Sequence, residues 1–411
     1  MDFDLPADDD PRRLAVREWA AAHPEPSVAD LHAAGYVVPH WPAPYGLDAD
    51  PIHQLIIDDE LRRAGVTRSG GAVNAIGVGW AAPTIYLAGS DWQKQRFLDP
   101  IFRAEEIWCQ LFSEPDSGSD LASLATRAER DGDEYVINGS KIWSSGAHHS
   151  QLGILIARTD PNAPKHKGLS YFILPMDLPG VTLSPIVDMT TAHSFNQTFF
   201  DNVRLHEKYR IGAEGDGWRL AKVTLANERV SLSSGGSLWG SGPSASDLLG
   251  LVRERGGIDD PRLRQEAARL YTESEVLRLG RLRTLSARLQ GRTPGPEASI
   301  QKILGDEHGQ NVMALAKSLV GADGMLAGSG PAGRLHAGAR FGPTEINTGS
   351  TFPDVDPIWH YGYLFAPALT IGGGTFAVQR NIVAEHVLGL PREPDVERGM
   401  TWRETRARLG T

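Results

Sequence analysis

The spacing of apolar residues changes twice along the chain, and this order limits the possible folds more than any other feature. Residues 11–107 follow the 3.6-residue period of amphipathic helices, residues 108–212 follow the two-residue period of strands, and the helical period returns after Gly217. An α/β fold would alternate the two periods throughout its length. The sequence therefore predicts an α+β protein with a helical domain over 1–107, a β domain over 108–212 and a second helical domain over 213–411.

Helices are expected where helix-forming residues are dense and caps or prolines mark the ends. The predicted helical ranges are 13–22, 53–63, 91–98, 218–233, 261–289, 297–320 and 376–387. The residues that follow Pro391 are polar and charged, so we expect a loosely ordered arm there.

Strands are expected in the central domain, where apolar and polar residues alternate between turn-forming clusters. Asn138-Gly139 stands between the runs 134–137 and 140–143, which is the pattern of a hairpin turn. Further strands are predicted over 152–157, 170–175 and 197–203. The β domain is expected to be a barrel or a sandwich.

Charge and cysteine content exclude several functional classes. The chain of 411 residues carries a net charge of −10, which argues against nucleic acid as its main partner. Its single cysteine, Cys109, allows neither an internal disulfide nor a thiolate metal cluster. No apolar run is long enough for a membrane span, and the N-terminal residues lack the apolar core of a secretory signal. We therefore expect a cytoplasmic protein without a metal site.

Two neighbouring segments of the β domain have the composition of a ligand site. The loop that ends the run 108–120 holds three serines and three acidic residues, which either expose hydroxyl and N–H groups to a polar ligand or form a surface turn. In the segment 141–146, Trp143 stands beside two hydroxyls. Such a tryptophan can stack on a flat ring whose edge the hydroxyls bind, or it can fill the core.

Glu228 is the candidate for acid–base chemistry. Together with Ala221, Leu225 and Leu232 it falls on one apolar stripe of the predicted helix 218–233. Burial there would destabilise its charged form and make it a stronger base. The alternative is a structural ion pair that uses Glu228 and the adjacent Arg229.

Glycine and histidine patterns give weaker signals. Gly372–Thr375 precedes the last predicted helix, where Thr375 is a plausible N-cap and the glycines allow a ligand to approach closely. Gly328–Gly333 fits the dinucleotide-binding pattern of glycines but lacks a strand before it. His148 and His149 would point to opposite faces of a strand, and no third ligand has the spacing of a metal site.

In this order and spacing, the segments resemble the acyl-CoA dehydrogenase family. The resemblance runs from about Asp59 to Pro391 and is carried by the segments 110–120, 133–139, 141–146, 199–204, 215–218 and 372–393. It implies an N-terminal helical domain, a central β-barrel and a C-terminal four-helix bundle, with non-covalent FAD between barrel and bundle. The chain resembles actinobacterial members that act on bulky or branched acyl-CoA thioesters, including those of steroid side chains.

The resemblance also implies roles for individual residues. Ser113 would bond the flavin edge, Trp143 would flank the flavin, and Ser145 would donate toward N5. Gly321 matches a loop that holds the partner subunit's FAD, and Thr375 would meet the cofactor at the start of the last helix. The implied cofactor-binding set is Leu111, Ser113, Gly118, Ser119, Trp143, Ser145, Gly321 and Thr375, and the implied substrate-binding residues are Ser119, near the CoA portion, and Arg229.

The implied reaction is α,β-dehydrogenation of an acyl-CoA thioester. A carboxylate removes the α-proton while the β-hydrogen leaves as hydride to flavin N5. Many members place this base just before the final Gly-Thr, where this chain has Gly373. Other members place it before the Arg of the first bundle helix, as in Glu228-Arg229, so these two residues are the predicted catalytic pair.

The resemblance implies a tetramer, with an electron-transfer flavoprotein as the usual electron acceptor. Many members carry an Arg that reaches a neighbouring FAD diphosphate, but the segment 251–264 lacks its motif. Arg262 or Arg264 could replace it in a homotetramer, which we favour, or a paralogue could supply it in a heterotetramer. The functional alternatives are a flavin monooxygenase or oxidase on the same fold and a non-catalytic subunit.

Overall fold

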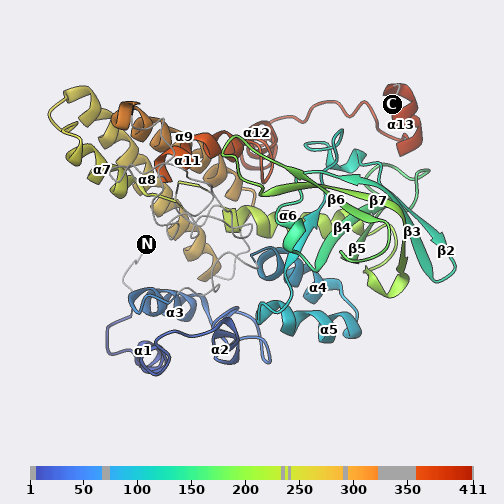
Figure 1. The fold of residues 1–411 in the computed structure, drawn as a ribbon, viewed down its shortest axis with the longest axis horizontal. Coiled ribbons are helices and arrows are strands. Elements are labelled where there is room, and N and C mark those ends of the chain that lie inside the picture. Colours follow the sequence, from blue (N-terminus) through green and yellow to red (C-terminus); the bar gives the residue numbers. More distant parts are fainter. Residues whose placement is uncertain are drawn as a thin grey trace. The chain divides into compact units, whose positions relative to one another are not determined.

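The chain divides into two units by its internal contacts (Figure 1). The computed structural model describes residues 6–66, 75–232, 237–238, 242–289, 295–322 and 358–409. Unit 1 comprises residues 1–72, 229–340 and 345–390, and unit 2 comprises residues 73–228, 341–344 and 391–411. Each unit is described by itself.

Unit 1 is helical, and α9 (Ala298–Val320) lies at its centre. It packs against α7 (Ala245–Glu254), α8 (Pro261–Leu289), α11 (Ile358–Phe365), the 3-10 helix η7 (Ala366–Thr370) and α12 (Phe376–Ile382), which continues as the π-helix η8 (Val383–Val387). The N-terminal helices α1 (Pro11–Ala22), α2 (Val28–Ala33) and α3 (Pro51–Arg63) also belong to this unit, and α3 packs on both α1 and α8. Helices α1, α3, α8 and α9, and α12 together with η8, confirm predicted helices to within a few residues, whereas α2, α7 and α11 form where none was predicted.

Unit 2 combines a sheet with helices. Its strands are β1 (Trp108–Leu111), β2 (Arg127–Asp131), β3 (Glu134–Lys141), β4 (Leu152–Arg158), β5 (Leu169–Pro175), β6 (Val181–Ile186), β7 (Phe195–His206) and β8 (Arg210–Ile211). Its helices include the π-helix η2 (Gly77–Ala81), α4 (Ala82–Ala88), α5 (Asp91–Phe102), most of α6 (Gly217–Leu232) and α13 (Trp402–Leu409). The short 3-10 helices η3 (Leu121–Ser123), η4 (Ala147–His149) and η5 (Glu207–Tyr209) connect the strands.

The eight strands form one curved sheet (Figure 1). Its strand order is β6-β7-β3-β2-β4-β5-β8, with β1 added in parallel to β4. Strands β2 and β4 meet through a single residue pair, Arg127 and Arg158. Among the described residues no pairing joins β6 to β8, so the strand pairings do not show the closed barrel that the resemblance implies.

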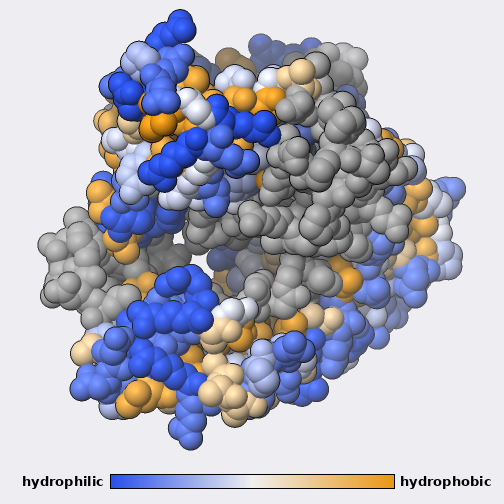
Figure 2. All heavy atoms as spheres, turned by 60° about the vertical axis from the view of Figure 1, so that its left-hand side comes forward, coloured by the Kyte–Doolittle hydropathy of each residue, from blue (hydrophilic) through white to orange (hydrophobic). Residues whose placement is uncertain are grey.

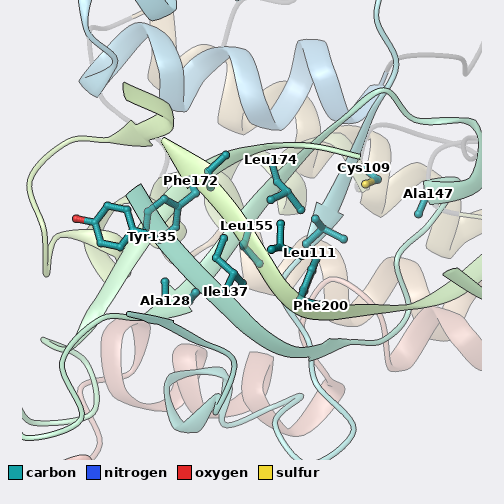
Figure 3. Close-up of a cluster of buried hydrophobic side chains, with 13 residues drawn as sticks. Cys109, Leu111, Ala128, Tyr135, Ile137, Ala147, Leu155, Phe172, Leu174 and Phe200 are labelled. Carbon is teal, nitrogen blue, oxygen red and sulfur yellow. The ribbon is translucent and has the colours of Figure 1, made fainter. Parts of the chain in front are cut away.

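One hydrophobic cluster of unit 2 lies between the strands of this sheet, and β4 and β5 are buried on both faces. Figure 3 shows side chains from β1, β3, β4, β5 and β7 converging between the strands, among them Leu111, Ile137, Leu155, Phe172 and Phe200. All five are at most 4% exposed. Burial of each such apolar side chain contributes about 1.5–3 kcal/mol to the free energy of folding. The cluster therefore stabilises the sheet to which the connecting loops are attached.

The prediction of a hairpin turn at Asn138-Gly139 is wrong. Strand β3 runs through both residues and pairs with β7, with a shift of register between Ile137 and Gly139. Gly139 has φ +142°, and a Cβ atom there would lie 2.6 Å from Thr126 Oγ1. A side chain there would collide with Thr126, so the glycine allows Thr126 to approach closely. The extra residue of the register shift lies in β7, where Asp201 and Asn202 face Asn138 alone. The hairpin turn instead joins β2 to β3 at Gly132, which has φ +66°.

The residues after Pro391 also differ from the prediction of a loose arm. They include helix α13, which begins with a reciprocal cap, since Thr401 N donates to Glu404 Oε2 at 2.8 Å and Glu404 N donates to Thr401 Oγ1 at 3.2 Å. The backbone N–H of Trp402 donates to Ala163 O at 2.9 Å, which ties the helix to the loop between β4 and β5.

On the face drawn in Figure 2, hydrophilic side chains cover most of the described surface, and hydrophobic ones form smaller groups. Within the described ranges, every helix is too short or too polar to cross a membrane.

Candidate active site

The loop from Leu111 to Ser119 is held by a buried ion pair. Glu114 and Ser117 exchange backbone hydrogen bonds of 3.1 and 3.0 Å, which closes a tight turn. The Glu114 carboxylate, 8% exposed, accepts from Lys141 Nζ at 2.8 Å and from the backbone N–H groups of Ala125 and Thr126 at 2.7 and 2.9 Å. Lys141 Nζ also donates to Phe112 O at 2.9 Å.

The electrostatics of this pair favour the ionised carboxylate. Burial alone would raise the pKa of Glu114, but the Lys141 ammonium and the hydrogen bonds from Thr126 and Ala125 outweigh it and lower that pKa. Burial lowers the pKa of Lys141, an effect that Glu114 opposes. We take the pair as charged because each head group has further hydrogen-bond partners besides the other, which helps to stabilise a buried ion pair. The sequence analysis did not identify either residue.

The two ligand-site segments of the sequence meet in unit 2. Ile142 N donates to Ser113 O at 2.8 Å, so the loop after β1 lies beside the turn after β3. Leu111 is fully buried in the core, which leaves only its backbone for a ligand. The hydroxyls of Ser113 and Ser119 take part in none of the hydrogen bonds found among the described residues, and a Cβ atom on Gly118 would meet open space.

Trp143 lies two residues after the end of β3 and is exposed. Its side chain is 56% exposed and its φ is +60°, which is uncommon for a bulky residue. Phe195 contacts its ring edge-on at 5.8 Å. Ser145 Oγ finds its acceptor, Trp143 O, only at 3.5 Å, which is too long for a strong hydrogen bond. An exposed indole beside available hydroxyls fits a flat, polar-edged ring such as the flavin of FAD.

A cluster of histidines supports the Trp143–Ser145 turn. The buried amide of Asn196 donates from Nδ2 to Ser144 O at 3.1 Å and to His148 Nδ1 at 2.9 Å, and its Oδ1 lies 2.8 Å from His193 Nε2. Burial, together with His149 and His193, lowers the pKa of His148 to about 4, which agrees with a neutral ring that accepts at Nδ1.

The placement of these histidines corrects the prediction of a strand. His148 and His149 lie in η4, where their ring centroids are 4.0 Å apart, and His148 stacks on His193 at 4.1 Å. The third histidine was missed because it is distant in sequence. Among the described residues no group of His, Cys, Asp and Glu is arranged to hold a metal ion.

Glu228 lies on the buried face of α6, as its position in the apolar stripe predicts. It is 6% exposed, and Gln110 Nε2 donates to its Oε2 at 3.2 Å. Gln110 precedes Leu111 in β1, so the same strand that starts the ligand-site loop also contacts this carboxylate. One turn earlier, Thr224 Oγ1 bonds Tyr171 OH at 2.9 Å and fixes α6 against the sheet. The side chain of Arg229 is outside the described part of the chain.

The remaining predicted residues belong to unit 1. Thr375 caps α12, where its Oγ1 accepts from Val378 N at 3.3 Å, as predicted. Gly373 and Gly374 have φ +68° and +91°, and Gln379 Nε2 donates to Gly373 O at 3.1 Å. Gly321 ends α9 with φ +54°.

A buried ion pair holds the segment that leads to Thr375. Lys302 Nζ donates to Asp306 Oδ2 at 2.6 Å and to Leu369 O at 3.0 Å. Burial raises the pKa of Asp306 to about 6, against the opposing effect of Lys302. The pair anchors η7 at Leu369, three residues before Gly372.

The two arginines considered for a diphosphate lie at the start of α8. Arg262 is 3.7 Å from Asp260, with 92% of its side chain exposed, and Arg264 Nη1 donates to Ile258 O at 3.0 Å. The glycine pattern Gly328–Gly333 lies outside the described residues.

Comparison with known proteins gives one consistent family. The family models for acyl-CoA dehydrogenase match in order: the N-terminal domain over residues 10–105, the middle domain over 109–203 and the C-terminal domain over 215–351. The solved structure named "Tcur3481-Tcur3483 steroid ACAD" has a TM-score of 0.74 and 28% identity, and the match covers 96% of this chain and all of that one.

Two relatives from Mycobacterium tuberculosis agree. The acyl-CoA dehydrogenase FadE34 is 38% identical over 92% of this chain, which spans only 48% of the relative's length. The acyl-CoA dehydrogenase IpdE1 is 38% identical over 88% of this chain and 87% of the relative. With all three domain models matched and a relative covered along most of its length, this chain belongs to the acyl-CoA dehydrogenase family.

Proposed function

We propose that this chain is a FAD-dependent acyl-CoA dehydrogenase in which Glu228 is the base. The observation that carries the proposal is the contact between the buried Glu228 carboxylate and Gln110, directly before the loop that ends in Ser119. A carboxylate shielded from water and held next to a ligand loop is suited to take a proton from carbon. Family membership supplies the reaction type.

The residues of this chain then divide the work of the first step. Glu228 takes the α-proton of the thioester, and Gln110 orients its carboxylate. Bound FAD would supply the acceptor, at N5, for the β-hydrogen that leaves as hydride. Arg229 is assigned to the catalytic pair and to substrate binding, and Ser119 to the CoA portion.

The proposed cofactor site uses the exposed indole and the available hydroxyls of unit 2. Trp143 would flank the flavin, and Ser113 would hydrogen-bond its edge. Ser145 would donate a hydrogen bond toward N5. Leu111 and Gly118 would contact the cofactor through their backbone. Thr375 is proposed to meet the cofactor at the start of the last helix, and Gly321 is proposed to hold the FAD of the partner subunit. The open space beside Gly118 and the available hydroxyl of Ser113 support this assignment.

The proposal also covers the substrate class and the oligomeric assembly. Similarity to a structure named as a steroid ACAD supports a bulky acyl group, such as a steroid side chain. We propose a tetramer, with an electron-transfer flavoprotein as acceptor and with 1–107, 108–212 and 213–411 as domains. Homotetramer and heterotetramer differ in whether Arg262 or Arg264, or instead a paralogue, meets the FAD diphosphate.

Anaerobic reduction by substrate tests this function. The purified protein, loaded with FAD, is mixed with a panel of straight-chain, branched and steroid acyl-CoA thioesters while the visible absorbance of the flavin is followed. We expect bleaching by at least one bulky thioester and slow reoxidation in air. Fast reoxidation with oxygen would instead identify an oxidase or monooxygenase. FAD uptake only with a co-expressed paralogue would identify a heterotetramer, and activity of that complex that survives Glu228→Gln would identify this chain as a non-catalytic subunit.

A further inference from the structure

The C-terminal arm, residues 391–409, lies against the segment that follows Ser119. Both belong to unit 2. Trp402 Nε1 donates to Ser123 O at 3.1 Å, a contact between residues 279 positions apart in the sequence. The first backbone N–H groups of α13, those of Trp402 and Arg403, donate to Ala163 O and Pro161 O at 2.9 and 3.1 Å. The first N–H groups of a helix have no acceptor within the helix, and here carbonyl groups of the loop between β4 and β5 accept from them.

A buried arginine joins the arm to the same segment. The guanidinium of Arg158, 2% exposed, stacks over the Trp402 ring at 4.5 Å. On its other side it donates to Ala122 O at 2.7 Å and to Leu124 O at 3.1 Å. Arg158 therefore connects the arm to the backbone of residues 122–124.

A second bridge lies nearer to Ser119. Lys165 Nζ contacts Asp120 Oδ2 at 2.9 Å and Glu397 Oε2 at 2.7 Å, so one ammonium links the arm to the residue after Ser119. Asp120 Oδ2 also accepts from Ser123 Oγ at 2.5 Å. Three side chains, Trp402, Arg158 and Lys165, together contact four residues directly after Ser119, namely Asp120, Ala122, Ser123 and Leu124.

We infer that the C-terminal arm is a clasp that holds the segment 118–124 in the conformation that binds the CoA portion of the substrate. Trp402, Arg158 and Lys165 are its positioning residues. The inference rests on the proposed function because Ser119 is assigned to CoA there. The clasp acts on affinity, since a loop that is ordered for only part of the time weakens binding in proportion.

Hydrogen exchange and coenzyme A binding of Trp402→Ala test the clasp. In the FAD-loaded protein we expect the amides of residues 118–124 to exchange several-fold faster than in the wild type. The dissociation constant of coenzyme A should rise about tenfold, as for a loop that is ordered roughly a tenth of the time, with FAD content unchanged. Lys165→Met, which removes the second bridge, should change both quantities in the same direction and serves if Trp402→Ala does not fold.

Trp92→Ala is the matched control. Trp92 is also a partly exposed indole with a cation over its ring, Lys208 at 4.9 Å, and it stacks edge-on against Tyr209 at 5.5 Å. Its loss should change neither the exchange of 118–124 nor the affinity for coenzyme A. If the wild type binds coenzyme A and Trp402→Ala leaves either the amide exchange of residues 118–124 or the affinity for coenzyme A unchanged, the clasp is contradicted and the proposed function is not. A wild type that binds no coenzyme A would overturn the proposed function and with it this role of the arm.

Discussion

Gln110 and Glu228 lie 118 residues apart in the sequence, yet the Gln110 side-chain amide donates to the Glu228 carboxylate at 3.2 Å. One partner comes from β1 and the other from α6. The contact links the strand that starts the proposed cofactor loop to the helix that carries the proposed base. Movement of either element would therefore change the position of the carboxylate relative to the loop.

Gln110→Leu should slow turnover and move the acid limb of the pH profile of kcat/KM to higher pH. The donated bond stabilises the ionised carboxylate, so its loss lets Glu228 protonate at higher pH. A bond to a charged group contributes about 1.5–3 kcal/mol, which corresponds to a shift of roughly one to two pH units. The measurement is kcat/KM against pH for a thioester that the wild type oxidises.

Gln54→Leu is a control for this prediction. Gln54 also uses its side-chain amide as a donor, to Ala49 O at 3.1 Å, but it lies on α3. Its pH profile should match that of the wild type. A Gln110→Leu profile with an unmoved acid limb would show that Gln110 does not stabilise the ionised base.

Lys141→Met should destabilise the protein strongly. It removes the ammonium from a carboxylate that is 8% exposed and leaves Glu114 buried without its countercharge. Loss of one partner from a buried ion pair costs about 3–5 kcal/mol, whereas replacement of both partners by apolar residues is often nearly neutral. The double variant Lys141→Met with Glu114→Leu should therefore unfold at higher denaturant than Lys141→Met alone. Equal midpoints for the two variants would contradict a charged pair.

The same pair predicts a loss of stability in acid. The folded-state pKa of Glu114 is below its ordinary value of 4.5, because the Lys141 ammonium and hydrogen bonds outweigh the effect of burial. Its contribution is present above pH 4.5 and is lost as the pH falls through the lowered value. Chemical unfolding at several pH values should show that Glu114→Gln flattens this acid limb. A wild-type limb that Glu114→Gln leaves unchanged would place the responsible carboxylate elsewhere.

Cys109 should be inert to thiol reagents in the native protein. Burial raises its pKa to about 12, and the side chain is fully enclosed in the core of unit 2. Alkylation followed by mass spectrometry should find no label under native conditions and complete label in denaturant. Rapid native labelling would mean that the sheet opens readily around β1.

Local periodicity predicted the helices well, because each helix forms its hydrogen bonds within one segment. Residues 261–289, for example, were expected as a helix and form α8 with the same bounds. The hairpin prediction at Asn138-Gly139 was wrong because the glycine is required by the close approach of Thr126. This contact depends on the fold, so no local sequence pattern reveals it. The Thr401–Glu404 cap is local and was available in the sequence as a Thr-x-x-Glu pattern.

The candidate site shows the same division. The apolar stripe of one helix was sufficient to predict that Glu228 is buried, whereas its contact with Gln110 depends on how α6 packs on β1. Lys141 shares the two-residue period of the buried Tyr135 and Ile137, which was a signal for burial. Its partner Glu114 had no such signal, because the pairing depends on the fold of a loop 27 residues earlier.

The most direct test of the account is the rate at which a substrate thioester bleaches the FAD-loaded Glu228→Gln variant under anaerobic conditions. The amide keeps the size of the side chain and cannot take the α-proton. We predict FAD content and thioester affinity close to those of the wild type, with a bleaching rate lower by about 10²–10⁴. Bleaching of the variant at a rate near that of the wild type would contradict the assignment of Glu228 as the base.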